Sequence, residues 1–199
     1  MTTKLSNFSF KIINFIVYGL IISLFSCQKL VKKSEQLAII TPEKKQKIIN
    51  KIYAQQKTLN LCNQERDKAL SKDSANIYLL NKQQYLVEIL CFLGAYQNNY
   101  QYLLLNNLSS EIKIIDFVTF DSNSDKLRLT NTNILNGTAE FDSLSQTLIL
   151  ETKTRSLGDC GSFVKYQWQN SAFVLKEYRH KPNCDQVFIP PENYPLIYP

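Results

Sequence analysis

The sequence predicts an α+β fold that is mainly β, either an antiparallel sandwich or a bent meander, with an N-terminal helix in front and two disulfides. Three observations point to this fold. From Ile77 onward, short apolar runs alternate with turn residues, which is typical of consecutive antiparallel strands. A lysine-rich segment with helical spacing precedes these runs. Beyond Cys27 the chain has an even number of cysteines, as disulfide-linked exported domains do.

Residues 1–26 are expected to be a lipoprotein signal peptide. Their almost wholly apolar run over 12–25 is short for a membrane span and suits a secretory signal. The run ends in Leu-Phe-Ser-Cys, which resembles a bacterial lipobox, and the resemblance implies that Cys27 is acylated and becomes the first residue of the mature chain. A simple signal peptide, or an uncleaved helix, is the alternative. Because Gln28 stands where inner-membrane lipoproteins usually carry aspartate, we expect an exported protein anchored to membrane lipid, at the periplasmic face of the outer membrane.

The formal net charge of +6 belongs to one part of the chain. Residues 29–57 hold eight lysines against two glutamates, whereas the chain from Thr58 onward is slightly acidic. Residues 27–58 are therefore expected to form a basic, membrane-proximal tether. Its lysines either attract anionic lipid headgroups, at about 1 kcal/mol each close to the surface, or simply form the solvated face of a helix. The rest of the chain offers no basic face, so a nucleic-acid partner is excluded.

A helix is predicted over residues 42–59. Thr41 supplies a capping hydroxyl, and Pro42 suits the first helical turn. Ile48 and Ile52 recur at helical spacing, with lysines on the opposite face.

Residues 59–199 are expected to form the disulfide-linked, mainly β domain. Glu88 stands in an apolar strand, where we expect it to pair with a tyrosine or a lysine. The tail from 189 to 199 is rich in proline and is expected to lie extended across the sheet. Its expected anchors are Tyr194, Leu196, Ile197 and Tyr198. The predicted strands cover residues 77–80, 85–93, 100–105, 112–120, 127–129, 147–152, 163–168 and 172–178.

Four cysteines, Cys62, Cys91, Cys160 and Cys184, remain for disulfide pairing and allow three connectivities. Local pairing would join Cys62 to Cys91 and Cys160 to Cys184. None of these cysteines has the close spacing of a metal site. His180 lies near Cys184 and is expected to be an exposed loop histidine rather than the partner of a catalytic thiol.

Two strings in the sequence are distinctive. One is K-x-R-x-L-G-D-C-G, from Lys153 to Gly161, and the other is G-A-Y-Q, from Gly94 to Gln97. With these strings the chain resembles an uncharacterised family of bacterial, especially cyanobacterial, envelope proteins that is classed as a domain of unknown function. The resemblance covers nearly all of residues 60–199. It implies export and disulfides, and it brings no activity with it.

The first string has two interpretations. In the preferred one it forms a tight backbone corner, in which Gly158 and Gly161 permit positive φ, Asp159 bonds nearby amides and Cys160 cross-links the turn. In the other, Arg155 and Asp159 form a ligand-binding pair beside the two glycines.

Other signals of chemistry are weak. Residues 121–125 have the D-x-N-x-D spacing of a calcium loop, but Lys126 and Thr132 occupy the glycine and glutamate positions, so a polar hairpin turn is preferred. The sequence nominates no catalytic residue, no metal and no cofactor. We therefore expect a non-catalytic binding or structural module of the cell envelope, with an envelope protein or a glycan as candidate partner. The alternatives are an inhibitor of a cell-wall hydrolase or protease and, third, an envelope enzyme without nominated residues.

Overall fold

The computed structural model describes residues 40–64, 74–121 and 127–199. The described residues all belong to one compact unit, Ala38–Pro199. The predicted signal peptide, its Cys27 and most of the loop considered for calcium lie outside the described residues. Within the described ranges, no helix has the length and apolar character needed to cross a membrane.

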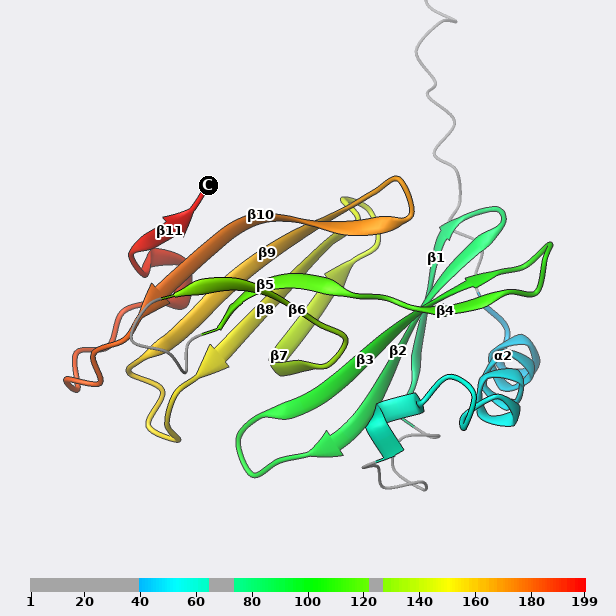
Figure 1. The fold of residues 1–199 in the computed structure, drawn as a ribbon, viewed down its shortest axis with the longest axis horizontal. Helices are drawn as coiled ribbons and strands as arrows, with labels where there is room; N and C mark the ends of the chain where they lie inside the picture. Colours follow the sequence, from blue (N-terminus) through cyan, green and yellow to red (C-terminus); the bar gives the residue numbers. More distant parts are fainter. Residues whose placement is uncertain (1–39, 65–73, 122–126) are drawn as a thin grey trace, which may run out of the picture. The chain divides into compact units, whose positions relative to one another are not determined.

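The described residues are mainly β, as the sequence predicts, with one α-helix near the start (Figure 1). The elements in chain order are α2 (Pro42–Ala54), the short 3₁₀ helix η1 (Leu61–Gln64), β1 (Asn76–Asn81), β2 (Gln84–Leu93), β3 (Asn98–Asn106), β4 (Ile112–Ile114), β5 (Phe117–Asp121), β6 (Arg128–Thr132), β7 (Leu135–Asp142), β8 (Thr147–Lys153), β9 (Gly161–Gln169), β10 (Ala172–Lys181), the 3₁₀ helix η2 (Pro191–Asn193) and β11 (Leu196–Tyr198).

Most strands belong to one antiparallel sheet in the order β1-β2-β3-β7-β8-β9-β10-β11, with β4 paired to β3 as well. The order follows the chain, as in a meander, except that β5 and β6 leave it and form a separate two-stranded ribbon. β3 changes its neighbour along its length: Leu103–Leu105 pair with β4, whereas Asn98–Tyr100 pair with β7. This three-residue seam between β3 and β7 joins the two halves of the sheet.

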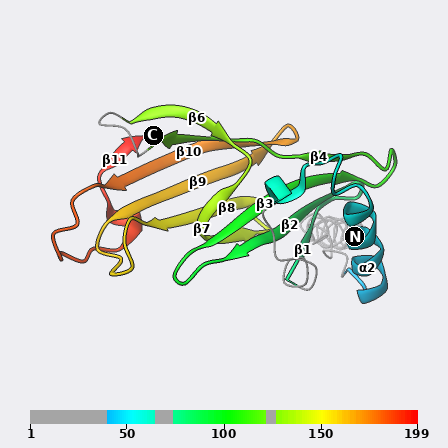
Figure 2. The same ribbon diagram turned by 60° about the horizontal axis from the view of Figure 1, so that its bottom comes forward.

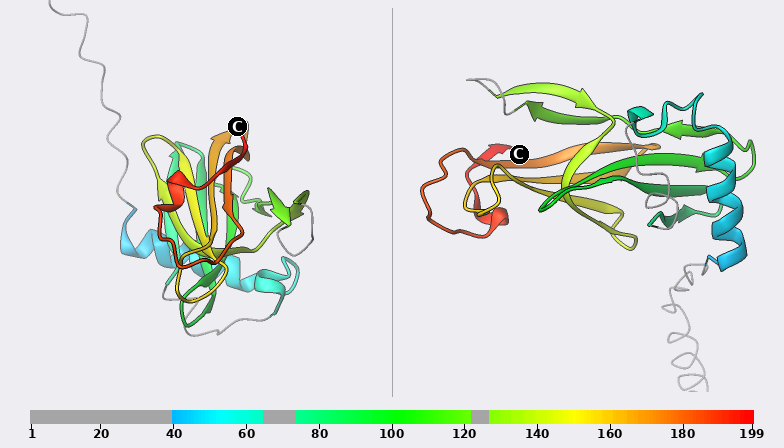
Figure 3. Two further views of the ribbon diagram at one scale, coloured as in Figure 1. Left: turned by 90° about the vertical axis from the view of Figure 1, so that its left-hand side faces the viewer. Right: turned by 90° about the horizontal axis from the view of Figure 1, so that it is seen from below.

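Different elements cover the two faces of the sheet. In β2, Tyr85 and Val87 pack in one apolar cluster with Ile48 and Ile52 of α2, whereas Leu86 between them belongs to the other cluster. That second cluster is rich in aromatic rings and includes Phe117 from β5. The β5–β6 ribbon therefore covers the face opposite the helix, at the end of the sheet formed by the later strands (Figures 2 and 3).

The helix is shorter than expected and ends at Ala54. Its start is as predicted, because the Thr41 hydroxyl accepts a hydrogen bond from the Lys44 amide at 3.3 Å. After the helix, Asn60 and Cys62 adopt positive φ, which a right-handed α-helix does not contain, so the chain bends here. The bend lets Cys62 reach Cys91 of β2, with the two Cα atoms 5.4 Å apart.

Predicted strand 112–120 is two strands, β4 and β5. The amide of Ile115 still donates to the Tyr102 carbonyl at 2.9 Å, and Phe117 then turns into the aromatic cluster. An unbroken apolar run does not show where the chain changes sheets. The sequence also missed β7, whose Gly137 and polar residues weaken its strand pattern.

The C-terminal tail differs in part from its prediction. Tyr194 is buried, but Leu196, Ile197 and Tyr198 are exposed and pair with β10 as the edge strand β11. The prolines before β11 have no amide hydrogen to donate, so the ladder with β10 is short.

Glu88 is a buried carboxylate on the sheet, as expected. Its two oxygens accept hydrogen bonds from the Tyr102 hydroxyl and the Asn76 side-chain amide, both at 2.8 Å. Burial, together with the nearby Glu88 charge, raises the pKa of the Tyr102 hydroxyl well above its usual range. Tyr102 therefore keeps its proton and remains a donor to the carboxylate.

Candidate functional site

The β8–β9 corner, residues 153–162, is the segment that carries the K-x-R-x-L-G-D-C-G string. Gly158 adopts φ +75°, in the left-handed region where side chains are strained. Gly161 lies so close to β8 that an added Cβ would stand 1.9 Å from the Thr152 carbonyl oxygen. Both glycines therefore have structural reasons to be there.

Arg155 and Asp159 face each other across this corner. The Arg155 Nε and Nη2 atoms donate to the two carboxylate oxygens at 2.8 and 2.5 Å. The Asp159 side chain is fully buried, whereas that of Arg155 is 40% exposed. Arg155 also donates to the Cys184 carbonyl at 3.0 Å, and the Gln186 amide donates to Asp159 at 2.6 Å. The pair therefore ties the corner to the segment after β10.

Lys181 reinforces the same link from the end of β10. Its ammonium group is nearly buried and donates to the carbonyls of Asp159 and Asn183 at 2.7 Å each. It also pairs with the Asp185 carboxylate at 2.6 Å. These three oxygens use all three ammonium protons, so Lys181 is a structural cation.

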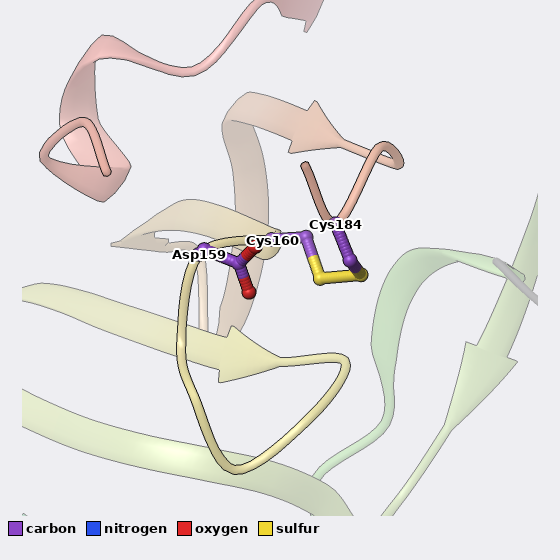
Figure 4. A group of neighbouring side chains, drawn as sticks. All are labelled: Asp159, Cys160 and Cys184. Carbon is purple, nitrogen blue, oxygen red and sulfur yellow. A yellow bond between two sulfur atoms is a disulfide. The ribbon is translucent and has the colours of Figure 1, made fainter. Parts of the chain in front are cut away.

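The Cys160–Cys184 disulfide closes the corner, with the Cα atoms 4.9 Å apart (Figure 4). The Asp159 carboxylate and the two sulfur atoms lie within 4.8 Å of one another. A metal would need free thiolates, yet the sulfurs bond each other and the carboxylate is occupied by Arg155. The cluster therefore does not fit a metal in the disulfide form.

Gln97 connects the two distinctive strings. Its side-chain amide donates to the Lys153 carbonyl at 2.6 Å, and its oxygen accepts from the Lys153 amide at 2.8 Å. The side chain thus pairs with the end of β8 as a neighbouring strand would. Gly94 permits the tight turn that presents it, because a Cβ there would lie 2.1 Å from the Gln97 carbonyl oxygen.

A cavity of about 380 Å³ lies beside the corner, between the β5–β6 ribbon and strands β7 to β10. The two ends of the β8–β9 corner reach it, since Lys153 and Ser162 both line it. Its size is at the small end of ligand pockets, which hold about 300–1,000 Å³. The other lining residues are Thr119, Phe120, Thr132, Ile134, Leu135, Asn136, Leu150, Thr152, Thr154, Val164 and Tyr178.

Hydroxyl groups are the most frequent polar groups of the cavity, and its apolar part consists of two aromatic rings and four aliphatic side chains. The hydroxyls of Thr152 and Ser162 share a hydrogen bond of 2.6 Å. Burial raises the pKa of the Tyr178 hydroxyl, and its hydrogen bond with Ser162 opposes the rise. The rings of Tyr178 and Phe120 lie 4.7 Å apart. An apolar wall next to hydroxyls and amides suits a ligand with both kinds of surface.

The structure places the predicted site residues as follows. Arg155 and Asp159 do form a pair, but the carboxylate bonds are internal to the fold. The cysteines use the local connectivity. His180 was wrongly expected in an exposed loop: it lies half-buried in β10, where its amide donates to the Pro195 carbonyl at 3.0 Å. Since Cys184 is in a disulfide, it provides no thiol for a catalytic partnership with His180.

Sequence reasoning missed most of the residues that surround the corner. Gln97 belonged to a string noted only for its resemblance, and Lys181 carried no motif. Phe120 and Tyr178 come to the cavity from strands far apart in sequence, and no local pattern joins them. In the sequence, only the unusual composition of the corner string indicated that this region was distinctive.

Asp159→Asn is expected to make the thermal stability of the protein depend less on pH in the acid range. Hydrogen bonds from Arg155 hold the pKa of Asp159 well below its ordinary value. A lowered pKa means that the carboxylate stabilises the fold above the unfolded-state pKa of about 3.9, and that this contribution is lost as pH falls below it. Thermal unfolding followed by circular dichroism from pH 7 to pH 2 should show a steeper loss for the wild type. The exposed Asp116→Asn serves as control, and equal slopes for the Asp159 variant and wild type would contradict the prediction.

Comparison with known proteins gives a family match. Residues 27–199 match the family described as "Protein of unknown function (DUF1176)". The predicted membership in a domain-of-unknown-function family is thereby confirmed, while its bacterial, especially cyanobacterial, envelope setting stays a prediction. Neither a curated protein nor a solved structure matches the chain.

Proposed function

The chain belongs to the DUF1176 family of proteins of unknown function, and we propose that it is a lipid-anchored envelope protein that binds a glycan without catalysis. The anchor is the acylated Cys27, at the periplasmic face of the outer membrane. The binding site is the cavity beside the β8–β9 corner.

The anchor is supported by the sequence before the described domain. The short apolar run ends in a lipobox-like string, and the family match begins at Cys27. Two disulfides are also typical of exported proteins. Intact-mass measurement of the membrane-bound form should show loss of residues 1–26 and a mass increase on Cys27, and an unprocessed N-terminus would refute the anchor.

The observation that carries the glycan assignment is the composition of the cavity. Sugars combine hydroxyl groups with apolar ring faces, so they suit a site that pairs Phe120 and Tyr178 with several hydroxyls and the Asn136 amide. The exposed Lys153 adds one positive charge at the rim, which suits a sugar that carries a carboxylate. The corner holds this rim in place, because the side chain of Lys153 lies over Gly158.

The composition of the same lining favours ligand binding over glycoside hydrolysis. Among the described residues that line the cavity, none is an aspartate, glutamate, histidine or cysteine. Glycoside hydrolysis ordinarily needs two carboxyl groups across the scissile bond. The buried carboxylates of Asp159 and Glu88 are already held by partners within the protein.

The binding test compares Lys153→Gln with Lys165→Gln. Both lysines lie on the sheet and both changes remove one charge, but only Lys153 lines the cavity. With N-acetylglucosamine–N-acetylmuramic acid as the probe in isothermal titration calorimetry, Lys153→Gln should weaken binding about tenfold or more, as loss of a charged hydrogen bond does. Lys165→Gln should bind as the wild type does. Equal binding by all three proteins, or no binding by the wild type, would overturn the glycan assignment.

Inhibition of a cell-wall hydrolase or protease is the second candidate. Leu157 is 52% exposed at the tip of the corner, which the disulfide and the Arg155–Asp159 pair hold rigid. A rigid loop with an apolar tip loses little entropy on entering an active-site cleft. Lysozyme inhibition by the wild type that Leu157→Asp abolishes would favour this candidate over the glycan module.

A further inference from the structure

A second hollow lies at the other end of the domain, between α2 and the end of β3 with the loop that follows it. Its volume is about 460 Å³. Ile48 and Leu105 are buried beneath it and fix the helix against the sheet. We call it the lysine groove, because Lys44, Lys47 and Lys51 line its helical side.

The three lysines form one continuous charged row. Their spacing of three and four residues places them on the same face of α2, over about 10 Å of helix at a rise of 1.5 Å per residue. No ion pair joins any of the three to an acidic side chain in the described parts of the chain. Glu43 is the only acidic group among the described residues of the lining. The lysine groove therefore carries two unbalanced positive charges.

The surroundings of the lysines are ordered by other contacts. The ammonium group of Lys44 lies 4.8 Å from the centre of the buried Tyr85 ring, which positions it. On the opposite wall, the Asn106 side-chain oxygen accepts from the Leu108 amide at 2.9 Å, and the Asn107 amide donates to Gln83 at 2.7 Å. These bonds hold the loop that presents polar groups to the groove.

We propose that the lysine groove binds a ligand that carries two or more phosphate charges. Lysine ammonium groups bind phosphate as point charges, and three in a row match separate phosphate oxygens better than one compact carboxylate. Asn106, Asn107 and Ser110 supply polar groups for the rest of the ligand. The phosphate belongs either to a lipid headgroup or to a free phosphorylated molecule. This site is independent of the glycan cavity and of its lining.

The test compares two triple variants of the full-length chain in non-ionic detergent. One is Lys44→Gln, Lys47→Gln, Lys51→Gln, in the lysine groove. The control is Lys57→Gln, Lys113→Gln, Lys176→Gln, which makes the same charge change at exposed positions elsewhere. Calorimetric titration uses inorganic pyrophosphate as the free probe, and micelles with or without cardiolipin, a lipid with two phosphates, as the lipid probe.

The groove variant should bind one of the two probes about tenfold or more weakly than wild type, while the control variant keeps wild-type affinity. Loss with pyrophosphate assigns a free ligand, and loss only with cardiolipin micelles assigns a lipid headgroup. Equal weakening in both variants would show general charge attraction and would overturn the proposal. Failure of the wild type to bind either probe would overturn it as well. Circular dichroism of both variants checks that they remain folded.

Discussion

Removal of both disulfides is expected to abolish stable folding at 37 °C. The bonds close loops with sequence separations of 29 and 24 residues, and loop-closure entropy assigns about 3 kcal/mol to each. Their joint loss of about 6 kcal/mol compares with a total stability of about 5–15 kcal/mol for ordinary domains. Each bond also lies in a packed region, since Cys62, Cys91 and Cys160 are buried.

Urea unfolding of three variants measures these contributions separately. Cys62→Ser with Cys91→Ser, and Cys160→Ser with Cys184→Ser, should each lower the free energy of unfolding by about 3 kcal/mol. The four-fold variant should show no cooperative transition at 37 °C. Cys27→Ser is the control for loss of a cysteine outside the disulfides. A four-fold variant as stable as wild type would refute the role of the bonds in stability.

Gly161→Ala is expected to be the most damaging single substitution in the β8–β9 corner. The new Cβ would stand 1.9 Å from the Thr152 carbonyl oxygen, and the alanine would have to adopt φ +155°. Backbone strain and overpacking together give a cost of about 3–5 kcal/mol. Because Gly161 pairs with Lys153 in the ladder, the change should also disturb the rim of the cavity.

Gly158→Ala is the matched control, since the residue lies in the same corner and also has positive φ. Its Cβ would meet only the flexible Lys153 side chain, at 3.3 Å from Cδ. The expected cost is the left-handed strain alone, about 1–2 kcal/mol, and Gly158→Asn should cost less. Urea unfolding ranks the three variants. Equal losses for Gly158→Ala and Gly161→Ala would contradict the steric argument.

The sequence predicts the fold well where the pattern is local. The capped helix start at Thr41 and the consecutive strands predicted over 163–168 and 172–178 follow from short signals, and both occur in the structure, the strands as the paired β9 and β10. Elements that depend on distant packing were harder. β7 has only its partners in β3 and β8 to define it, and the exit of the chain from β4 to β5 depends on an aromatic cluster assembled from distant strands.

In the candidate site, too, the features set by local sequence were predictable and those set by distant packing were not. The glycines, the aspartate and the cysteine of the corner formed a visible string, so the corner was predicted as a cross-linked turn. The cavity beside it could not be predicted, because Phe120 and Tyr178 meet only after the β5–β6 ribbon folds across the sheet. Lys181 was also hidden, since two of its three partners are backbone carbonyls, which every sequence has.

The short seam between β3 and β7 has a mechanical consequence. Only three residue pairs join the two halves of the sheet there, and each half is cross-linked by its own disulfide. Phe117 of the β5–β6 ribbon adds contacts between the two halves, because its ring centroid lies 5.7 Å from that of Tyr102 of β3 and 5.3 Å from that of Phe173 of β10, and the last two lie 6.4 Å apart. The β5–β6 ribbon therefore helps to hold the two halves of the sheet together. A tensile load across the seam would be shared by these rings, the three-residue ladder and the hydrogen bonds from Gln97 to Lys153, and we expect the longer strand ladders within each half to yield later.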